Sequence, residues 1–312
     1  MTRVLVTGAA GFVGSTLVPM LRQLGHEVLA LDNFTYGQGR RAALERVAEV
    51  RQVDILDEDA MLAALRSFRP EAVMHLAAMH FIPDCNRRPV DATRINVLGT
   101  ESLLRACRAA GGMRRVILTS SAAVYPISDE ALSDDSPAEP TDIYGITKAA
   151  NEWQGQRFAE LTGIDAVSVR LFNVFGPGET SPHVIPEIIE QVRRGAPALD
   201  LGNVEPKRSY IHVADVARGF IALMDCPLPS PHTRVNLGHH EEASVREVVA
   251  HIERLIGRPI EIRQDPARVR KSDRMYLRCD YTRLNRLTGW APRMSLEEGL
   301  RDLLQTEKIA CV

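Results

Sequence analysis

Short runs of consecutive hydrophobic residues alternate with longer amphipathic stretches along the first half of the chain. The runs predict buried strands at residues 4–6, 28–31, 72–74, 116–118 and 166–169. The stretches between them predict helices at residues 12–24, 58–68, 90–110 and 142–161. Unbroken hydrophobicity is typical of parallel strands that are covered on both faces. The pattern therefore predicts an α/β fold, a doubly wound parallel sheet of the Rossmann type.

The pattern changes after Asn173, where prolines and glycines interrupt the hydrophobic runs. Helical spacing returns at residues 244–256 and 295–304. We expect residues 1–175 to form the Rossmann domain, with residues 209–238 returning to it. A smaller C-terminal lobe is then expected from residues 176–208 and 239–312, inserted at the carboxyl edge of the sheet.

Composition narrows the class of protein. The 312 residues are 45% hydrophobic and 25% charged, with a formal net charge of −2 and no long block of one sign. This balance argues against nucleic-acid and membrane-surface partners. No hydrophobic stretch approaches the roughly 18 residues that cross a bilayer. The first strand begins too early to leave room for a signal peptide, so we expect a cytoplasmic protein.

Cysteine and histidine spacing gives no metal motif. No CxxC pair and no HExxH sequence occurs, so we predict neither a structural zinc site nor metal catalysis. The five scattered cysteines are expected to be free thiols: Cys85, Cys107, Cys226, Cys279 and Cys311.

A glycine-rich turn follows the first predicted strand and opens the first predicted helix. Gly8, Gly11 and Gly14 allow a tight turn, a close approach of the backbone to a pyrophosphate, and close packing of helix on strand. The backbone N–H groups of the helix start, at Phe12 and Val13, favour a phosphate. The turn therefore predicts a dinucleotide site.

Asp32 at the end of the second predicted strand indicates which dinucleotide binds. A carboxylate there accepts hydrogen bonds from the adenosine ribose hydroxyls and repels a 2′-phosphate, so the cofactor is predicted to be NAD rather than NADP. Asp54 and Ile55 lie between the strands predicted at residues 28–31 and 72–74 and are the expected neighbours of the adenine.

Three residues form a candidate catalytic set. Tyr144 and Lys148 are four residues apart, on one face of a predicted helix. A lysine ammonium and a cationic nicotinamide nearby would stabilise the phenolate of a tyrosine whose ordinary pKa is about 10. Ser121 ends the strand predicted around residues 116–118, from which its hydroxyl is able to hold a reacting oxygen in line with Tyr144. The set predicts proton transfer at a substrate hydroxyl coupled to hydride transfer.

The chain resembles the extended short-chain dehydrogenase/reductase family, in its nucleotide-sugar epimerase and dehydratase branch. The resemblance covers nearly the whole sequence. It rests on residues 7–14, 32–33, 75–78, 96–100, 120–125, 144–148, 170–177 and 208–216.

The resemblance implies further site residues and partners. Additional NAD contacts are implied at Asn33, Leu76, Ala77, Ala78 and Asn96. A nucleotide sugar is implied as substrate in the smaller lobe, with Asn173, Arg208 and Arg270 on its diphosphate. Other implied substrate contacts are His80, Phe81, Ser121, Ala122, His183 and Val184. A homodimer is implied through the helices at residues 90–110 and 142–161.

Ala122 and Ala123 decide between the reactions of that branch. Dehydratases of the branch carry Asp-Glu there, and decarboxylases usually carry Glu at the second position, whereas alanine transfers no proton. A 4-epimerase needs no such group, so a 4-epimerase acting on a UDP-hexose is the preferred interpretation. The alternatives are a 4-ketoreductase, a decarboxylase or dehydratase, and, outside enzymes, an NAD-binding sensor. His80 is expected either to wall the sugar site or to add an acid/base group.

Overall fold

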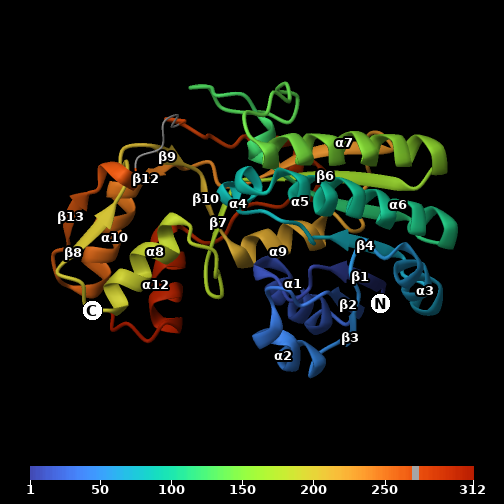
Figure 1. Cartoon of the computed structure of the whole chain (residues 1–312), viewed down its shortest axis with the longest axis horizontal. Helices are drawn as coiled ribbons and strands as arrows, with labels where there is room; N and C mark the ends of the chain where they lie inside the picture. The colour runs from blue at the N-terminus through green and yellow to red at the C-terminus, as the bar shows by residue number, and fades with distance from the viewer. Residues whose placement is uncertain (269–273) are drawn as a thin grey trace.

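The fold is built on a seven-stranded sheet, seen in the computed structural model that describes residues 1–268 and 274–312 (Figure 1). Every neighbouring pair in this sheet is parallel. The order is β11-β6-β5-β4-β1-β2-β3. The strands are β1 (Arg3–Thr7), β2 (Glu27–Asp32), β3 (Glu49–Gln52), β4 (Ala72–His75), β5 (Arg115–Ser121), β6 (Asp165–Leu171) and β11 (His232–Leu237). The predicted doubly wound sheet and its five predicted strands are confirmed.

Helices cover both faces of the sheet. One face carries α1 (Phe12–Gln23), α9 (Val213–Ala222) and α11 (Thr282–Thr288), and the other carries α3 (Glu58–Phe68), α6 (Gly99–Ala110) and α7 (Ile143–Thr162). Side chains of a strand alternate between the faces, so Val4 and Val6 join the first core while Leu5 joins the second. This two-sided burial explains why the strands are uniformly hydrophobic.

Shorter helical segments complete the Rossmann domain. These are η1 (Gln38–Arg40), α2 (Arg41–Glu45), α4 (Ile82–Arg87), α5 (Pro89–Thr93), η2 (Arg94–Leu98) and η3 (Ala122–Val124). The single helix predicted for residues 90–110 is therefore divided, because η2 is a π-helical turn. There the Asn96 carbonyl accepts a hydrogen bond from Asn151 Nδ2 at 2.8 Å, which satisfies a group that a regular helix would pair internally.

The smaller lobe has its own hydrophobic core, at the opposite end of the molecule from the sheet (Figure 1). Its helices are α8 (Val184–Arg193), α10 (Val245–Ile256) and α12 (Leu296–Thr306), with β8 (Ala198–Leu201) paired to β13 (Glu261–Gln264) and η4 (Pro266–Arg268) following. Ser244 and Ser295 cap α10 and α12 in capping boxes with Glu247 and Glu298. These two helices confirm the periodicity seen in the sequence.

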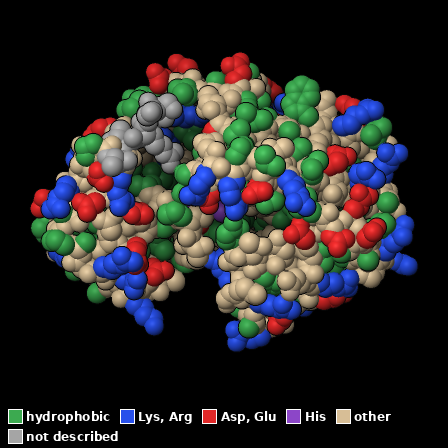
Figure 2. Space-filling view, in the orientation of Figure 1, with side chains coloured by type: hydrophobic (Ala, Val, Ile, Leu, Met, Phe, Trp, Pro, Cys, Tyr) green, Lys and Arg blue, Asp and Glu red, His purple; other side chains and the backbone are tan. Residues whose placement is uncertain are grey.

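Two short strand pairs lie near the junction of the lobes: β7 (Asn173–Phe175) beside β10 (Tyr210–His212), and β9 (Lys207–Arg208) beside β12 (Ala243–Ser244). After β10 the chain returns to the sheet, since α9 packs on α1 and β11 pairs with β6. Residues 239–312 were all predicted to belong to the smaller lobe. Leu284 and Trp290 are instead buried in the core of the Rossmann domain. Figure 2 shows a notch between the lobes.

The cysteines are free thiols, four of them buried. Within residues 1–268 and 274–312, no helix has the length and hydrophobicity needed to cross a membrane.

A buried histidine links the sheet to α6. His75 Nδ1 lies 2.7 Å from Thr7 Oγ1, and His75 Nε2 lies 3.0 Å from Thr100 Oγ1. Burial, and to a lesser extent the charge of Lys148, lowers the pKa of His75 to about 3. The ring is therefore neutral in the folded protein at neutral pH.

The neutrality of His75 predicts a pH-dependent stability. Its folded-state pKa lies below the ordinary value of about 6.5. The contribution of neutral His75 to the free energy of unfolding is therefore complete above pH 6.5 and is lost as the pH falls toward 3. Between about pH 7 and pH 5 this loss is on the order of 2 kcal/mol. Urea unfolding at both pH values is expected to show a smaller loss in His75→Gln, which keeps an uncharged hydrogen-bonding side chain. Equal losses in the two proteins would contradict this assignment.

Candidate active site

The glycine-rich turn lies between the carboxyl end of β1 and the start of α1. Gly8 has a φ of +67°, and a Cβ there would come within 2.6 Å of the Ala77 nitrogen. A Cβ on Gly14 would lie 2.4 Å from the Gly8 carbonyl oxygen. Only glycine fits either position, so the turn packs tightly against both its helix and the loop after β4.

The geometry of this turn fits a dinucleotide pyrophosphate. Gly11 caps α1 without a side-chain hydrogen bond, and the first turn of the helix, which begins at Phe12 and Val13, carries no acidic residue. Its backbone N–H groups and the helix dipole are thus available to an anion. The sheet order reverses here, since β2 and β4 flank β1, and dinucleotides bind at such a point.

Asp32 lies at the carboxyl end of β2, beside this turn. Its carboxylate accepts hydrogen bonds from the Ala10 nitrogen at 2.9 Å and the Phe34 nitrogen at 2.7 Å. These contacts fix the carboxylate and leave lone pairs for ribose hydroxyls. Arg40 Nη1 donates to the Ala10 carbonyl at 3.0 Å, and Arg40 also donates to the Gly178 carbonyl across the cleft.

The other predicted cofactor residues follow the carboxyl ends of the same strands. Asn33 Nδ2 donates to Asp54 Oδ2 at 3.1 Å, next to Ile55, whose side chain abuts Gly99. Leu76, Ala77 and Ala78 form the half-buried loop directly after β4, facing the turn at Gly8.

Asn96 lies deeper than its predicted role implies. Its amide accepts from the Met79 nitrogen at 2.8 Å and donates to the Met79 carbonyl at 2.9 Å and to Thr147 Oγ1 at 3.0 Å. Asn96 is 1% exposed. The structure therefore assigns to Asn96 the holding of the loop after β4 against α7.

The structure brings Ser121, Tyr144 and Lys148 together. Ser121 ends β5, while Tyr144 and Lys148 lie on one face of the first turns of α7. Asp142 caps this helix by accepting from the Gly145 nitrogen at 2.8 Å. A Cβ on Gly145 would lie 2.3 Å from the Ala123 carbonyl, so glycine lets the helix start press against the end of β5.

Burial controls the protonation of this set. It raises the pKa of Tyr144 well above its ordinary value, while the hydrogen bond from Ser121 lowers it. Burial lowers the pKa of Lys148 to about 8. Lys148 Nζ donates to the Thr119 carbonyl at 2.9 Å and lies 5.7 Å from the centre of the Tyr144 ring. Without ligands the phenol is thus protonated, and additional positive charge is required to ionise it.

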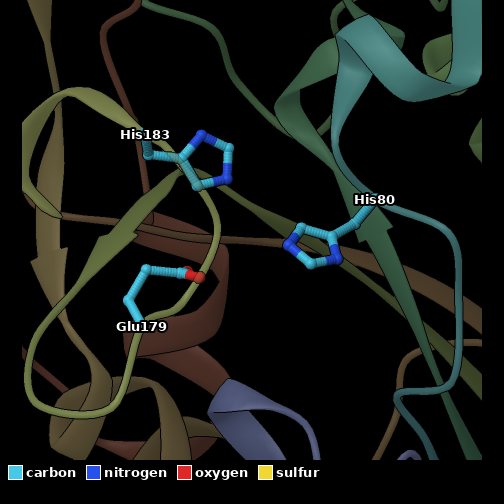
Figure 3. Close-up of side chains that lie close together, drawn as sticks. All are labelled: His80, Glu179 and His183. Carbon is cyan, nitrogen blue, oxygen red and sulfur yellow. The ribbon is translucent and has the colours of Figure 1, made fainter. Parts of the chain in front are cut away.

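Predicted substrate residues from two separate segments of the chain lie close together. His80 and Phe81 follow β4, and His183 precedes Val184 at the start of α8 (Figure 3). The Phe81 and His183 rings meet edge to face with centroids 5.5 Å apart. Glu179 lies among them and was missed in the sequence, because no local motif connects it to His80.

Asn173, Ala122 and two arginines lie near the junction of the lobes. Asn173 begins β7, and its buried Oδ1 has no hydrogen-bond partner among the described residues, which suits a ligand contact. Arg208 ends β9, and burial, followed by the charge of Arg208, lowers the pKa of the half-buried Arg274. Arg274 Nη2 donates to the Tyr125 carbonyl at 2.8 Å, and Arg274 Nη1 lies 3.4 Å from the carbonyl of Ala122. The sequence pattern did not single out Arg274.

Arg270, the third residue predicted on the diphosphate, lies outside the described residues.

Known proteins are similar to this chain over nearly its whole length. The chain is 34% identical over 308 residues to a UDP-glucose 4-epimerase of Mycolicibacterium smegmatis, covering 96% of each protein. It is 30% identical to UDP-glucuronic acid decarboxylase 1 of Xenopus tropicalis, covering 96% of this chain and 70% of that protein. Among solved structures, a Thermus thermophilus UDP-glucose 4-epimerase in complex with NAD superposes with a TM-score of 0.88 at 30% identity, covering 98% of this chain and 99% of the other.

The family model agrees with these similarities. The model of the NAD dependent epimerase/dehydratase family matches residues 4–238, which include the glycine-rich turn, the catalytic set and the returning strand β11. The chain belongs to the NAD dependent epimerase/dehydratase family.

Proposed function

We propose that this protein is an NAD-dependent nucleotide-sugar 4-epimerase, acting in the cytoplasm on a UDP-hexose. The observation that carries the proposal is the meeting of Ser121, Tyr144 and Lys148 at the end of β5, one strand away from the β4–β1 switch point. The similarity to UDP-glucose 4-epimerases supports the reaction and the uridine nucleotide.

The side chains of this chain move and hold the proton. Bound NAD supplies a reversible hydride acceptor for C4 of the sugar. Tyr144 would act as a phenolate, stabilised by the ammonium of Lys148 and the positive charge of the nicotinamide, and accept the proton of the 4-hydroxyl. Ser121 keeps the C4 oxygen in line with the Tyr144 hydroxyl. After the 4-keto sugar turns over, Tyr144 would return the proton to the same oxygen as C4 takes back the hydride on its other face.

The residues after Ser121 favour epimerisation over elimination or decarboxylation. Ala122 is buried and Ala123 half-buried, and neither side chain carries a proton to transfer. The decarboxylase among the relatives keeps a decarboxylase or reductase reaction as the second candidate. A sensor without turnover is disfavoured, because NAD binding alone requires no buried Tyr144–Lys148 pair.

Product analysis tests this reaction. The purified protein, without added NAD, is incubated with UDP-, GDP-, CDP- and dTDP-sugars, and products are examined by mass spectrometry and proton NMR. A new anomeric signal at unchanged mass is expected for one UDP-hexose. Loss of water or carbon dioxide would instead identify a dehydratase or decarboxylase, and no product from any sugar would favour the sensor.

Tyr144→Phe is expected to lower turnover by roughly 100- to 10,000-fold, the usual contribution of a positioned acid/base. The substitution removes only the phenol oxygen, so NAD should remain bound in amounts equal to those in the unmodified protein. Release of the nucleotide by denaturation and its quantification by chromatography check this point. Tyr36→Phe, at a 79% exposed tyrosine, is the matched control and should retain turnover. Normal turnover in Tyr144→Phe would rule out the mechanism.

Asp32→Ala is expected to weaken NAD binding by roughly ten- to a hundredfold, because the charge-assisted hydrogen bonds to the ribose are lost. NADP binding should improve, because the repelling carboxylate is gone while Arg40 stays beside Ala10. Calorimetric titration of both nucleotides measures the ratio. The Asp32→Ala/Arg40→Ala variant should lose the gain in NADP affinity, and an unchanged NAD preference in Asp32→Ala would contradict the role of Asp32.

A homodimer through α6 and α7 is the proposed assembly. Ile146, Trp153 and Leu161 project from one face of α7, with Trp153 72% exposed. Hydrophobic side chains lie among charged ones over this part of the surface (Figure 2). Burial of such a face in a symmetric contact removes it from water.

Trp153→Glu is expected to convert the dimer into a monomer, because the contact would bury an unpaired carboxylate. Sedimentation velocity at micromolar concentration distinguishes the two states. Arg46→Glu, at an exposed arginine just after α2 and away from α6 and α7, is a control for charge alone. A monomeric unmodified protein would remove the proposal of a dimer.

A further inference from the structure

Three side chains of types that bind metals lie close together, outside the glycine-rich turn and the catalytic set. The ligand atoms of His80, Glu179 and His183 all lie within 4.8 Å of one another. Figure 3 shows their side chains turned toward a common space, with His80 on the chain that follows β4 and the other two on the loop before α8. We propose that these residues form a binding site for a divalent transition metal of the zinc class.

The donor set matches this class of metal. Two imidazole nitrogens and one carboxylate oxygen are a common protein ligand set for Zn²⁺, which leaves a fourth position for water or another oxygen. Zinc–ligand bonds of about 2.1 Å in a tetrahedron place ligand atoms about 3.4 Å apart. The ligand atoms, which lie within 4.8 Å of one another, would need to approach by at most about 1.4 Å to reach this geometry. Calcium or magnesium is disfavoured, because both require mainly oxygen ligands.

The ligands are already oriented by neighbouring groups. Glu179 Oε1 accepts a hydrogen bond from the Ser181 nitrogen at 2.8 Å, and the His183 ring rests against the edge of Phe81. Such outer contacts fix the direction of ligating side chains.

The hydroxyl of Ser181 competes with a metal for His80 Nε2. Its hydroxyl oxygen lies 3.0 Å from His80 Nε2, the position from which it hydrogen-bonds the ring when no metal is present. A metal bound through Nε2 requires this hydroxyl to turn away. Loss of the Ser181 hydroxyl should therefore leave metal affinity equal or higher, whereas loss of a ligand should lower it.

The charges around the site are compatible with a cation. Glu179 places a carboxylate among the two imidazoles, which opposes the charge of a bound cation. The metal would join residues that lie far apart in the sequence, which explains why no spacing motif indicated the site. His80 and His183 are also predicted substrate residues, but the inference does not depend on the proposed reaction, because metal binding is measured without a sugar and the ligands exclude Ser121, Tyr144 and Lys148.

Cobalt(II) titration tests the proposal, since tetrahedral Co²⁺ absorbs visible light strongly and Zn²⁺ displaces it. The chelator-treated full-length protein with its bound NAD is titrated with Co²⁺ and then with Zn²⁺. One equivalent is expected to bind with a tetrahedral spectrum. His80→Gln, Glu179→Gln and His183→Asn should each weaken binding by at least about tenfold, the effect of losing even an outer-shell partner.

Ser181→Ala is the matched control, because it lies between two ligands on the same loop and should retain metal binding. Thermal melting of every variant reports whether the fold is intact. Absence of stoichiometric binding, or equal affinity in the three ligand variants and the unmodified protein, would overturn the metal site. Either result would leave the epimerase proposal standing, since product analysis tests that reaction separately.

Discussion

The geometry of the active site depends on a buried ion pair between α7 and β6. Glu152 accepts hydrogen bonds from Arg170 Nε at 2.8 Å and Nη2 at 2.7 Å, and from Ser120 Oγ at 2.6 Å. Both charged side chains are almost fully buried, where removal from water is expensive unless each polar atom has a partner. Here the Arg170 guanidinium also stacks over the Tyr125 ring at 4.6 Å.

This pair fixes the helix that carries the catalytic set. Ser120 and Ser121 are adjacent on β5, so their side chains point to opposite sides of the strand. The hydrogen bond from Ser120 to Glu152 fixes one face of the strand end, and Ser121 then points from the other face toward Tyr144. Because Glu152 lies one turn beyond Lys148 on the same helix, the anchor sets the rotation of α7 and with it the direction of both catalytic side chains.

The sequence predicted most of what local patterns determine. Hydrophobic runs located five strands of the sheet, and the glycine spacing located the dinucleotide turn, because both depend on residues close together in the chain. The π-helical turn at Asn96, the burial of Trp290 in the Rossmann core and the contact of Arg274 with Tyr125 depend on partners far along the sequence. Their positions follow from tertiary packing, which no local period encodes.

The junction between the lobes has a further consequence. The chain crosses between them repeatedly, and β7 and β10 run side by side as a hydrogen-bonded ribbon where it does so (Figure 1). Neither lobe is a continuous segment of the chain. Strand β11 joins the sheet after α8 and β8 of the smaller lobe, and α11 packs on the sheet after α10 and β13 of that lobe. The smaller lobe therefore cannot be exchanged as a cassette. A change of substrate in such a protein has to arise by substitution of side chains in place, along a cleft whose frame stays constant.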